Sequence, residues 1–234
     1  MTLLRDIARA VVWMAPASPA KNRVLRALGH DIHPSARLRS NGVWQVDKFS
    51  VGPGAHVDYG NLFRHLTMII MGAESHIGRF NTATAHPVFS RSAGGGQLEL
   101  ADHATITSRH SIDCSATVTV GPFAIVAGHG SRLMTHAIDL KVDAQSARPI
   151  SFGERSFVGT DVLVLGGAVL PPRSVLGGGA VLLPGRGTDA PGLFAGVPAK
   201  RVGDVSGAWF DRTGTHTRRA VVTDEDGTER TSDF

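Results

Sequence analysis

The chain has 234 residues, of which 28 are glycine and one is cysteine, and its 24 Lys and Arg exceed its 20 Asp and Glu. The single cysteine, Cys114, excludes an intrachain disulfide and cysteine-rich zinc sites. Glycine at this frequency without the three-residue period of collagen indicates many tight corners in a globular protein.

Residues 1–30 predict an N-terminal helical segment. Apolar side chains of MTLLRDIARAVVWMA recur at helical spacing, at Leu3, Leu4, Ile7, Val11 and Val12. Because residues 1–48 hold eight Lys and Arg against three Asp, the net charge of +4 is an N-terminal feature. We expect this helix either to pack on the body or on a neighbouring subunit, or to rest on a membrane surface as a basic amphipathic helix. Its apolar run is too short and too interrupted to span a membrane or to direct export. The expected location is therefore the cytoplasm, either free or at the inner face of the membrane.

Residues 31–203 carry a six-residue repeat. From Phe152 the sequence divides into FGERSF, VGTDVL, VLGGAV, LPPRSV and LGGGAV, with a bulky apolar first position and a mostly small fifth position. The same rule reappears in several registers upstream, in units that begin at Val51, Met71, Ile77, Leu100, Ile106, Ile112, Val120 and Val126. This period fits no helix, and alternate side chains of a short strand point to opposite faces. The pattern predicts an all-β triangular solenoid with parallel sheets, eighteen residues to a coil.

Two segments break the repeat and are predicted to be loops, residues 86–97 and residues 132–150. Loops that leave a regular scaffold are where binding and catalytic residues concentrate. The tail, residues 204–234, has lost the period and is expected to be irregular, either partly disordered or folded as a short hairpin around DEDG.

The repeat and the closing segment FAGVPAKRVG, residues 194–203, together resemble the hexapeptide-repeat acyltransferases with a left-handed parallel β-helix, in particular the maltose, galactoside and exopolysaccharide O-acetyltransferases. The form A-G-x-P-A-K of that group is matched by Ala195, Gly196, Pro198, Ala199 and Lys200. The resemblance implies a left-handed coil, a homotrimer and acetyl-CoA as the acyl donor, with no metal. It also implies a sugar or glycan acceptor, a role in polysaccharide biosynthesis and no nucleic-acid partner.

The same resemblance implies where CoA binds. Its long arm would follow the turns at Gly159, Thr160, Gly178 and Gly179, and its nucleotide phosphates would meet the cations Lys200 and Arg201. Many relatives have Thr-Lys after the last repeat, where this chain has Leu183 and Pro184. Arg186 is therefore a candidate to replace that part of the contact.

His136, in RLMTHAIDL, matches the active-site histidine of the group. Acetyl transfer to a hydroxyl needs a base, and a neutral imidazole suits this task near pH 7. Asp139, three residues later, is the candidate to orient the imidazole, and a backbone carbonyl is the alternative. A backbone N–H near Thr160 could stabilise the developing oxyanion, and no acyl-enzyme is required.

Asn81 and His110 are polar side chains at the normally small fifth position. Such side chains either point outward or form buried hydrogen bonds, because an unpaired polar group is costly in a core. By the resemblance, Asn81, His110 and Asp113 are candidate acceptor-binding residues.

Two rival functions stay open at this point. A γ-type carbonic anhydrase would need three histidines converging on zinc at a subunit interface, but His129 and His136 lack the close second pair of those enzymes, and the AGVPAKRVG ending favours CoA. The other rival is a non-catalytic β-prism scaffold, which His136 on an intact loop argues against.

Overall fold

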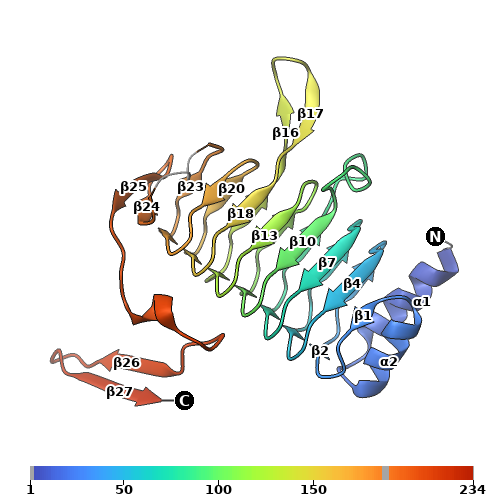
Figure 1. The fold of residues 1–234 in the computed structure, drawn as a ribbon, viewed down its shortest axis with the longest axis horizontal. Helices are drawn as coiled ribbons and strands as arrows, with labels where there is room; N and C mark the ends of the chain where they lie inside the picture. The colour runs from blue at the N-terminus through green and yellow to red at the C-terminus, as the bar shows by residue number, and fades with distance from the viewer. Residues whose placement is uncertain (1–2, 186–189, 234) are drawn as a thin grey trace.

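The structure, a computed structural model, describes residues 3–185 and 190–233. Short parallel strands stack coil upon coil into a three-sided solenoid, with two helices at its N-terminal end and a hairpin projecting from its side (Figure 1). The predicted all-β solenoid is confirmed.

Each side of the solenoid is one sheet. The first sheet contains β1 (Asp31–Ile32), β4 (Lys48–Val51), β7 (Met68–Met71), β10 (Gln97–Leu100), β13 (Val118–Val120), β18 (Ile150–Phe152) and β21 (Val169–Leu170). The second contains β2 (Arg37–Leu38), β5 (His56–Val57), β8 (His76–Ile77), β11 (Thr105–Ile106), β14 (Ile125–Val126), β19 (Phe157–Val158), β22 (Val175–Leu176), β24 (Leu193–Ala195) and β25 (Lys200–Gly203). The third contains β3 (Gly42–Trp44), β6 (Leu62–Arg64), β9 (Thr82–Thr84), β12 (Ser111–Asp113), β15 (Arg132–Met134), β20 (Leu163–Leu165) and β23 (Val181–Leu182).

The hexapeptide pattern explains the core. The first-position side chains from Phe152 to Leu182 are all buried, and so are the small fifth-position side chains such as Ser156 and Ala168. Two side chains from each unit therefore fill the interior. Close packing of such small and large side chains leaves little room for substitution.

The corners depend on one backbone conformation. From Phe152 onward, the fourth residue of every unit has a positive φ: Arg155 (55°), Asp161 (53°), Gly167 (89°), Arg173 (53°), Gly179 (69°) and Gly185 (68°). Half of these residues are not glycine, so the corner geometry imposes the left-handed conformation on Arg and Asp as well.

The expected coil of eighteen residues holds only in the C-terminal part. Phe152 pairs with Leu170, eighteen residues later, whereas Val51 pairs with Met71, twenty residues later. The buried Phe63 lies eight residues before Met71, so the two additional residues lie at the corner between the third and first sheets. These longer corners explain why the upstream repeats appear in several registers.

Two helices, not one, cover the N-terminal end: α1 (Leu3–Met14) and α2 (Pro19–Ala27), the latter capped by Ser18 with Pro19 in its first turn. Lys21 joins them to the solenoid, because its ammonium donates to the carbonyls of Trp13 (2.9 Å), Ala15 (2.8 Å) and Arg39 (2.9 Å). Among the described residues, no helix has the length and apolarity needed to span a bilayer.

The apolar side chains of α1 do not pack against the solenoid, as they would if the helix were simply buried on it. Leu4 is 78% exposed and Val11 64% exposed, whereas Arg9 is buried and donates to the carbonyls of Val46 (3.2 Å) and Leu28 (2.8 Å). Trp13, which is fully buried, provides the main apolar contact of the helix with the solenoid. The stripe is left facing outward.

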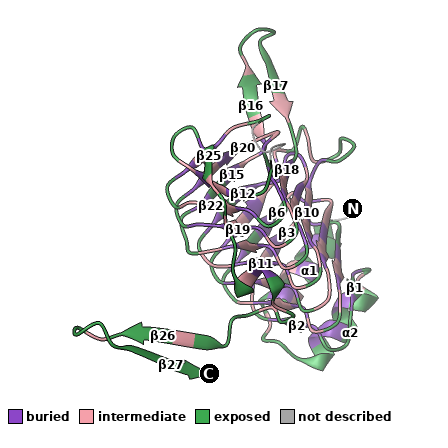
Figure 2. Ribbon diagram, turned by 60° about the vertical axis from the view of Figure 1, so that its left-hand side comes forward, coloured by how far each residue is buried: buried purple, intermediate pink, exposed green. Residues whose placement is uncertain are grey.

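Two hairpins lie outside the solenoid. β16 (His136–Asp139) and β17 (Ala144–Ala147) form an antiparallel hairpin within the segment expected to be a loop, whose first residues, 132–134, belong instead to β15. In the tail, the short 3₁₀ helix η1 (Ala208–Asp211) precedes the antiparallel β26 (Arg219–Thr223) and β27 (Glu229–Asp233), which flank DEDG. Both hairpins are largely exposed (Figure 2).

Candidate active site

Both breaks in the repeat leave the solenoid at the same corner. The predicted loop 86–97, whose last residue belongs to β10, follows β9, and the β16–β17 hairpin follows β15. Both β9 and β15 belong to the third sheet. We call this corner, between the third and first sheets, the insertion corner. Side chains from both breaks can therefore meet there.

His136 is the first residue of the hairpin and is held by Asp113 of the preceding coil. Asp113 ends β12 and pairs with Met134 of β15, so the chain that leaves β15 passes directly over its carboxylate. Asp113 Oδ2 accepts hydrogen bonds from the His136 backbone N–H (2.8 Å) and from the ring Nδ1 (2.9 Å). The imidazole is thus fixed both by its backbone and by its ring.

The Asp113 carboxylate is buried and fully engaged. Thr135 Oγ1 donates to Oδ2 (2.5 Å), and Ser115 donates to Oδ1 from its hydroxyl (2.6 Å) and its backbone N–H (3.2 Å). Burial alone would raise the pKa of Asp113, but the hydrogen bonds from Ser115, Thr135 and His136 more than offset it and hold the pKa below its usual value. Asp113 is therefore a carboxylate acceptor at neutral pH.

This carboxylate selects the tautomer of His136. An ionised carboxylate only accepts hydrogen bonds, so Nδ1 must carry the proton, and Nε2 of the neutral ring then holds a free lone pair. The described part of the chain provides no hydrogen-bond partner for Nε2. The arrangement is that of a base with an orienting carboxylate.

The segment 86–97 supplies two neighbours of this imidazole. The ring centroid of His136 lies 5.9 Å from that of His86 and 6.3 Å from that of Phe89. His136 also lines a hollow of about 390 Å³, together with Ile138, Leu165 and Pro184 among others. The imidazole is therefore close to side chains of the other insertion and borders open space.

Asp139 does not orient His136, contrary to the sequence-based expectation. It lies three residues along an extended strand, paired with Ala144, and its carboxylate accepts instead from the backbone N–H of Lys141 (3.0 Å). Residues three apart in a strand point to opposite faces. Asp113, expected to bind the acceptor, takes the orienting position instead.

Asn81 and His110 are not at the surface where an acceptor could reach them. Asn81 is 1% exposed and His110 2% exposed, and Asn81 Oδ1 accepts from the His110 backbone N–H (2.9 Å). The ladder continues at both ends, through the Asn81 N–H to Asn61 (2.8 Å) and through His110 Nδ1 to the Ser131 N–H (3.2 Å). Of the two alternatives considered for these side chains, buried hydrogen bonding is correct. Burial also lowers the pKa of His110 to about 4.

The four residues expected along the CoA arm do lie together. Gly159 and Thr160 follow β19, Gly178 and Gly179 follow β22, and the Gly179 N–H donates to the Thr160 carbonyl (2.9 Å). A side chain at Gly159 would bring its Cβ within 2.7 Å of the Gly178 nitrogen, so glycine is required there. We call this stacked corner, between the second and third sheets, the glycine corner.

The expected phosphate cations lie on the last strand of the second sheet. Lys200 and Arg201 are both exposed in β25, and Arg201 forms an ion pair with Asp204 and donates to the Pro191 carbonyl (3.0 Å). Lys200 is without an ion pair among the described residues. Arg186 lies outside the described residues.

The insertion corner and the glycine corner lie at opposite ends of the strands of the third sheet. One chain therefore does not bring His136 and Gly159 into a common site. His129, the second histidine weighed for a zinc site, lies at the glycine corner, where its backbone N–H donates to Thr160 Oγ1 (3.3 Å).

Sequence reasoning missed Ser115, Thr135, His86 and Phe89. The signals were present, since Ser115 is two residues after Asp113 and Thr135 directly precedes His136. These residues can be recognised only if the register between β12 and β15 is known. Ile112 pairs with Leu133, which is 21 residues later and not the expected eighteen. Cys114, between two of these groups, has a fully buried thiol whose pKa is raised by that burial, so it is not a nucleophile.

No family model matches the sequence. Among solved structures, the polysialic acid O-acetyltransferase OatWY is similar with a TM-score of 0.54 and 15% identity, over 75% of this chain and 84% of that one. A mutant of AntD, an N-acyltransferase from Bacillus cereus in complex with dTDP and coenzyme A, is similar with a TM-score of 0.52 and 12% identity, over 82% of this chain and 92% of that one. These likenesses show the fold, a left-handed parallel β-helix, as predicted.

Proposed function

We propose that this protein is an acetyl-CoA-dependent O-acetyltransferase that acts on a hydroxyl of a sugar or glycan by direct transfer. The observation that carries the proposal is the Asp113–His136 pair, in which a buried carboxylate fixes Nδ1 at 2.9 Å and leaves Nε2 as an acceptor. The resemblance of AGVPAK to the O-acetyltransferase group supports CoA as the donor.

In the proposed reaction, the acceptor hydroxyl gives its proton to Nε2 of His136 as its oxygen attacks the thioester carbonyl. The C–S bond then breaks, and the CoA thiolate takes the proton from the imidazolium. Asp113 stabilises the imidazolium in between, because its charge is opposite and already in contact. The developing oxyanion needs a donor, and the Thr160 N–H is a candidate because it has no hydrogen-bond acceptor among the described residues.

We infer that the complete site needs a second copy of the chain. His136 and the glycine corner lie at opposite ends of the strands of the third sheet, so a thioester lying along Gly159 and Gly178 would meet the imidazole of another copy. A homotrimer of prisms supplies such an arrangement three times. The outward-facing stripe of α1 is available either to a neighbouring copy or to the inner face of a membrane.

The acceptor class is inferred from chemistry and from likeness of fold. OatWY is a polysialic acid O-acetyltransferase, and the AntD structure contains dTDP and coenzyme A. A glycan hydroxyl reaching the insertion corner would pass between the segment 86–97 and the β16–β17 hairpin. We therefore expect these two segments to set acceptor specificity, in a cytoplasmic polysaccharide pathway.

The test is release of free thiol from acetyl-CoA in the presence of a panel of sugars and glycans, with mass spectrometry of the acceptor. The expected result is thiol release that depends on a carbohydrate and a product that carries one added acetyl ester. Acetyl transfer only to amines, or hydration of CO₂ with no thiol release, would reject the proposed function.

A further inference from the structure

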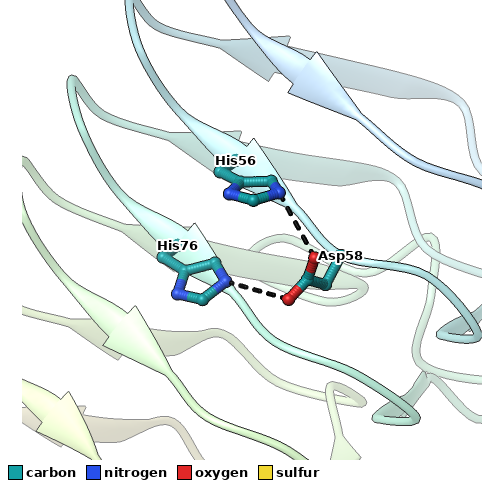
Figure 3. A group of neighbouring side chains, drawn as sticks. All are labelled: His56, Asp58 and His76. Carbon is teal, nitrogen blue, oxygen red and sulfur yellow. Dashed lines mark ion pairs between the residues drawn. The ribbon is translucent and has the colours of Figure 1, made fainter. Parts of the chain in front are cut away.

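A second cluster of titratable side chains lies on the second sheet, away from the insertion corner. His56 of β5 and His76 of β8 are paired neighbours on adjacent strands, with their rings stacked at 5.0 Å, and Asp58 follows β5 (Figure 3). Asp58 Oδ1 lies 3.3 Å from His56 Nε2, and Oδ2 lies 3.6 Å from His76 Nε2. Two imidazole nitrogens thus approach one carboxylate from the same side.

These nitrogens lack proper partners. His56 Nε2 and both ring nitrogens of His76 are buried atoms that make no hydrogen bond with the described residues. Buried polar atoms without partners are rare and costly in folded proteins, and a bound ion is one common explanation. We propose that His56, Asp58 and His76 bind a divalent transition-metal ion, with zinc as the expected occupant.

The spacing suits this ion. Ligand atoms about 2.1 Å from a tetrahedral zinc lie about 3.4 Å from one another. The 3.3 and 3.6 Å separations, which run to the two different oxygens of Asp58, are close to that length, and one ligand atom from each of the three residues lies within 4.8 Å of the others. Imidazole and carboxylate together are a donor set that zinc accepts.

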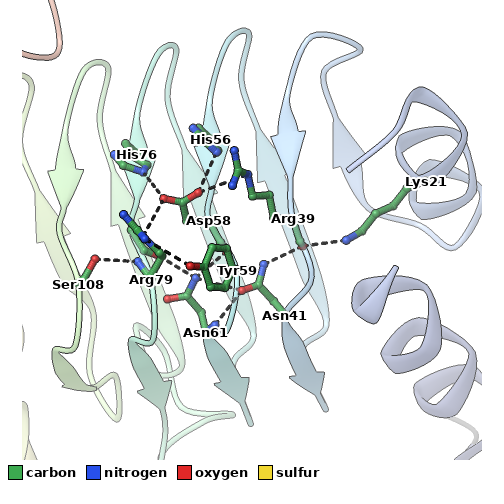
Figure 4. Close-up of polar contacts among 11 residues, drawn as sticks. Lys21, Arg39, Asn41, His56, Asp58, Tyr59, Asn61, His76, Arg79 and Ser108 are labelled. Carbon is green, nitrogen blue, oxygen red and sulfur yellow. Dashed lines mark hydrogen bonds and ion pairs between the residues drawn. The ribbon is translucent and has the colours of Figure 1, made fainter. Parts of the chain in front are cut away.

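Two guanidinium groups compete for Asp58. Arg39 Nε lies 3.4 Å from Oδ1, the oxygen that His56 approaches, and Arg79 Nε lies 3.8 Å from Oδ2, the oxygen that His76 approaches (Figure 4). Their side chains are 52% and 54% exposed, so both can turn into solvent when an ion binds. Arg79 also donates to the Tyr59 hydroxyl (3.3 Å).

Residues of the C-terminal tail contact this cluster and the turn before β8. The His216 ring lies 5.5 Å from that of His76, and Thr215 Oγ1 donates to the Glu74 carbonyl (3.1 Å). These contacts join a segment some 140 residues later in the chain to β8 and its turn. Zinc at the cluster would thus stabilise the part of the solenoid on which the tail rests, a structural role separate from acetyl transfer.

The test uses the full chain without a histidine tag, freed of metal by a chelator and titrated with zinc against a chromophoric competitor. We expect about one zinc per chain, a rise in melting temperature on zinc addition, and a loss of affinity of at least about tenfold in both His76→Gln and Asp58→Asn. The exposed His33, on the first coil, provides the matched control His33→Gln, which should bind zinc as the wild type does.

His136→Ala separates this site from the proposed active site. It should retain full zinc binding, and chelation should leave acetyl transfer by the wild type unchanged. The proposal is overturned if the wild type takes up no zinc, if His76→Gln and Asp58→Asn both bind it normally, or if zinc is lost in His136→Ala instead. Circular dichroism of each variant shows that a loss of zinc is not a loss of fold.

Discussion

Asp113 is the residue on which the candidate site depends most closely. It accepts from the hydroxyls of Ser115 and Thr135, from the backbone N–H groups of Ser115 and His136, and from the His136 ring, so both of its oxygens are occupied. A carboxylate in such a setting fixes position and tautomer together. Its replacement should therefore affect chemistry more than binding.

Asp113→Asn should lower kcat by about 10²–10⁴-fold while the KM for acetyl-CoA changes little. An amide has only one acceptor oxygen, so it cannot satisfy Thr135, Ser115 and His136 at once. Steady-state kinetics with saturating acceptor measure the effect. Asp139→Asn is the matched control, and an equal loss in that variant would contradict the assignment.

Asp113 should also make stability depend on pH. Its pKa is lower in the folded chain than the ordinary value of 3.8, so the stability it contributes is present above pH 3.8 and is lost as the pH falls through the lowered value. The difference in urea midpoint between the wild type and Asp113→Asn should therefore be largest at neutral pH and shrink in acid. A difference that stayed constant between neutral pH and pH 2 would show that the carboxylate charge is not involved.

Only one residue of the Asp113–His136 pair could be predicted from the sequence in its proposed role. His136 could be recognised because its place at a break in the repeat is visible in the sequence. Its partner Asp113 could not be recognised, because it lies 23 residues earlier in the chain. The two side chains come together only because β12 pairs with β15 at an offset of 21 residues. Asp139 is the nearer carboxylate in the sequence, but the sequence does not show that it lies in a strand, paired with Ala144.

At the scale of elements, a buried ladder of amides runs along the inside of the glycine corner. Asn61 Nδ2 donates to Asn41 Oδ1 (3.0 Å) and to the Gly78 carbonyl (2.8 Å), and Asn61 Oδ1 accepts from the Asn81 N–H (2.8 Å), as Figure 4 shows in part. Each coil thereby satisfies polar groups of the next. The repeat pattern indicated that the polar fifth position was exceptional, but only the stacking of coils explains it.

Asn61→Leu should destabilise the chain by about 2–5 kcal/mol, because it leaves several buried backbone and side-chain groups without partners. Arg64→Ala, an exposed position on the adjacent strand β6, should change stability by no more than about 0.5 kcal/mol. Urea denaturation followed by circular dichroism measures both. Similar small effects in the two variants would show that the ladder is dispensable.

For the whole molecule, the six-residue repeat explains the solenoid, and the two insertions that interrupt the repeat form the candidate active site. The inserted segments 86–97 and 136–147 emerge from one corner, whereas the stacked glycines lie at another. Both sets of residues could be recognised in the sequence, but they could not be assigned to corners, because the length of a coil changes from about twenty residues upstream to eighteen downstream. Their separation is what requires a second copy in the proposed mechanism.

Mixed oligomers test that requirement. His136→Ala lacks the base, and Lys200→Glu places a negative charge where the CoA phosphates are expected, so each variant alone should be nearly inactive. Oligomers assembled from both should recover activity, because some interfaces combine an intact His136 with an intact Lys200 of another copy. No recovery, with mixed oligomers shown by native mass spectrometry, would place both residues in the site of one chain.

The central claim is that His136 removes the proton from the acceptor hydroxyl. The most direct measurement is the rate of acetyl transfer from acetyl-CoA to the identified acceptor by His136→Ala, compared with the wild type at equal concentration and with an unchanged oligomeric state. The account predicts a fall of about 10²–10⁴-fold, the usual contribution of a general base. A variant that transfers acetyl groups at nearly the wild-type rate would contradict it.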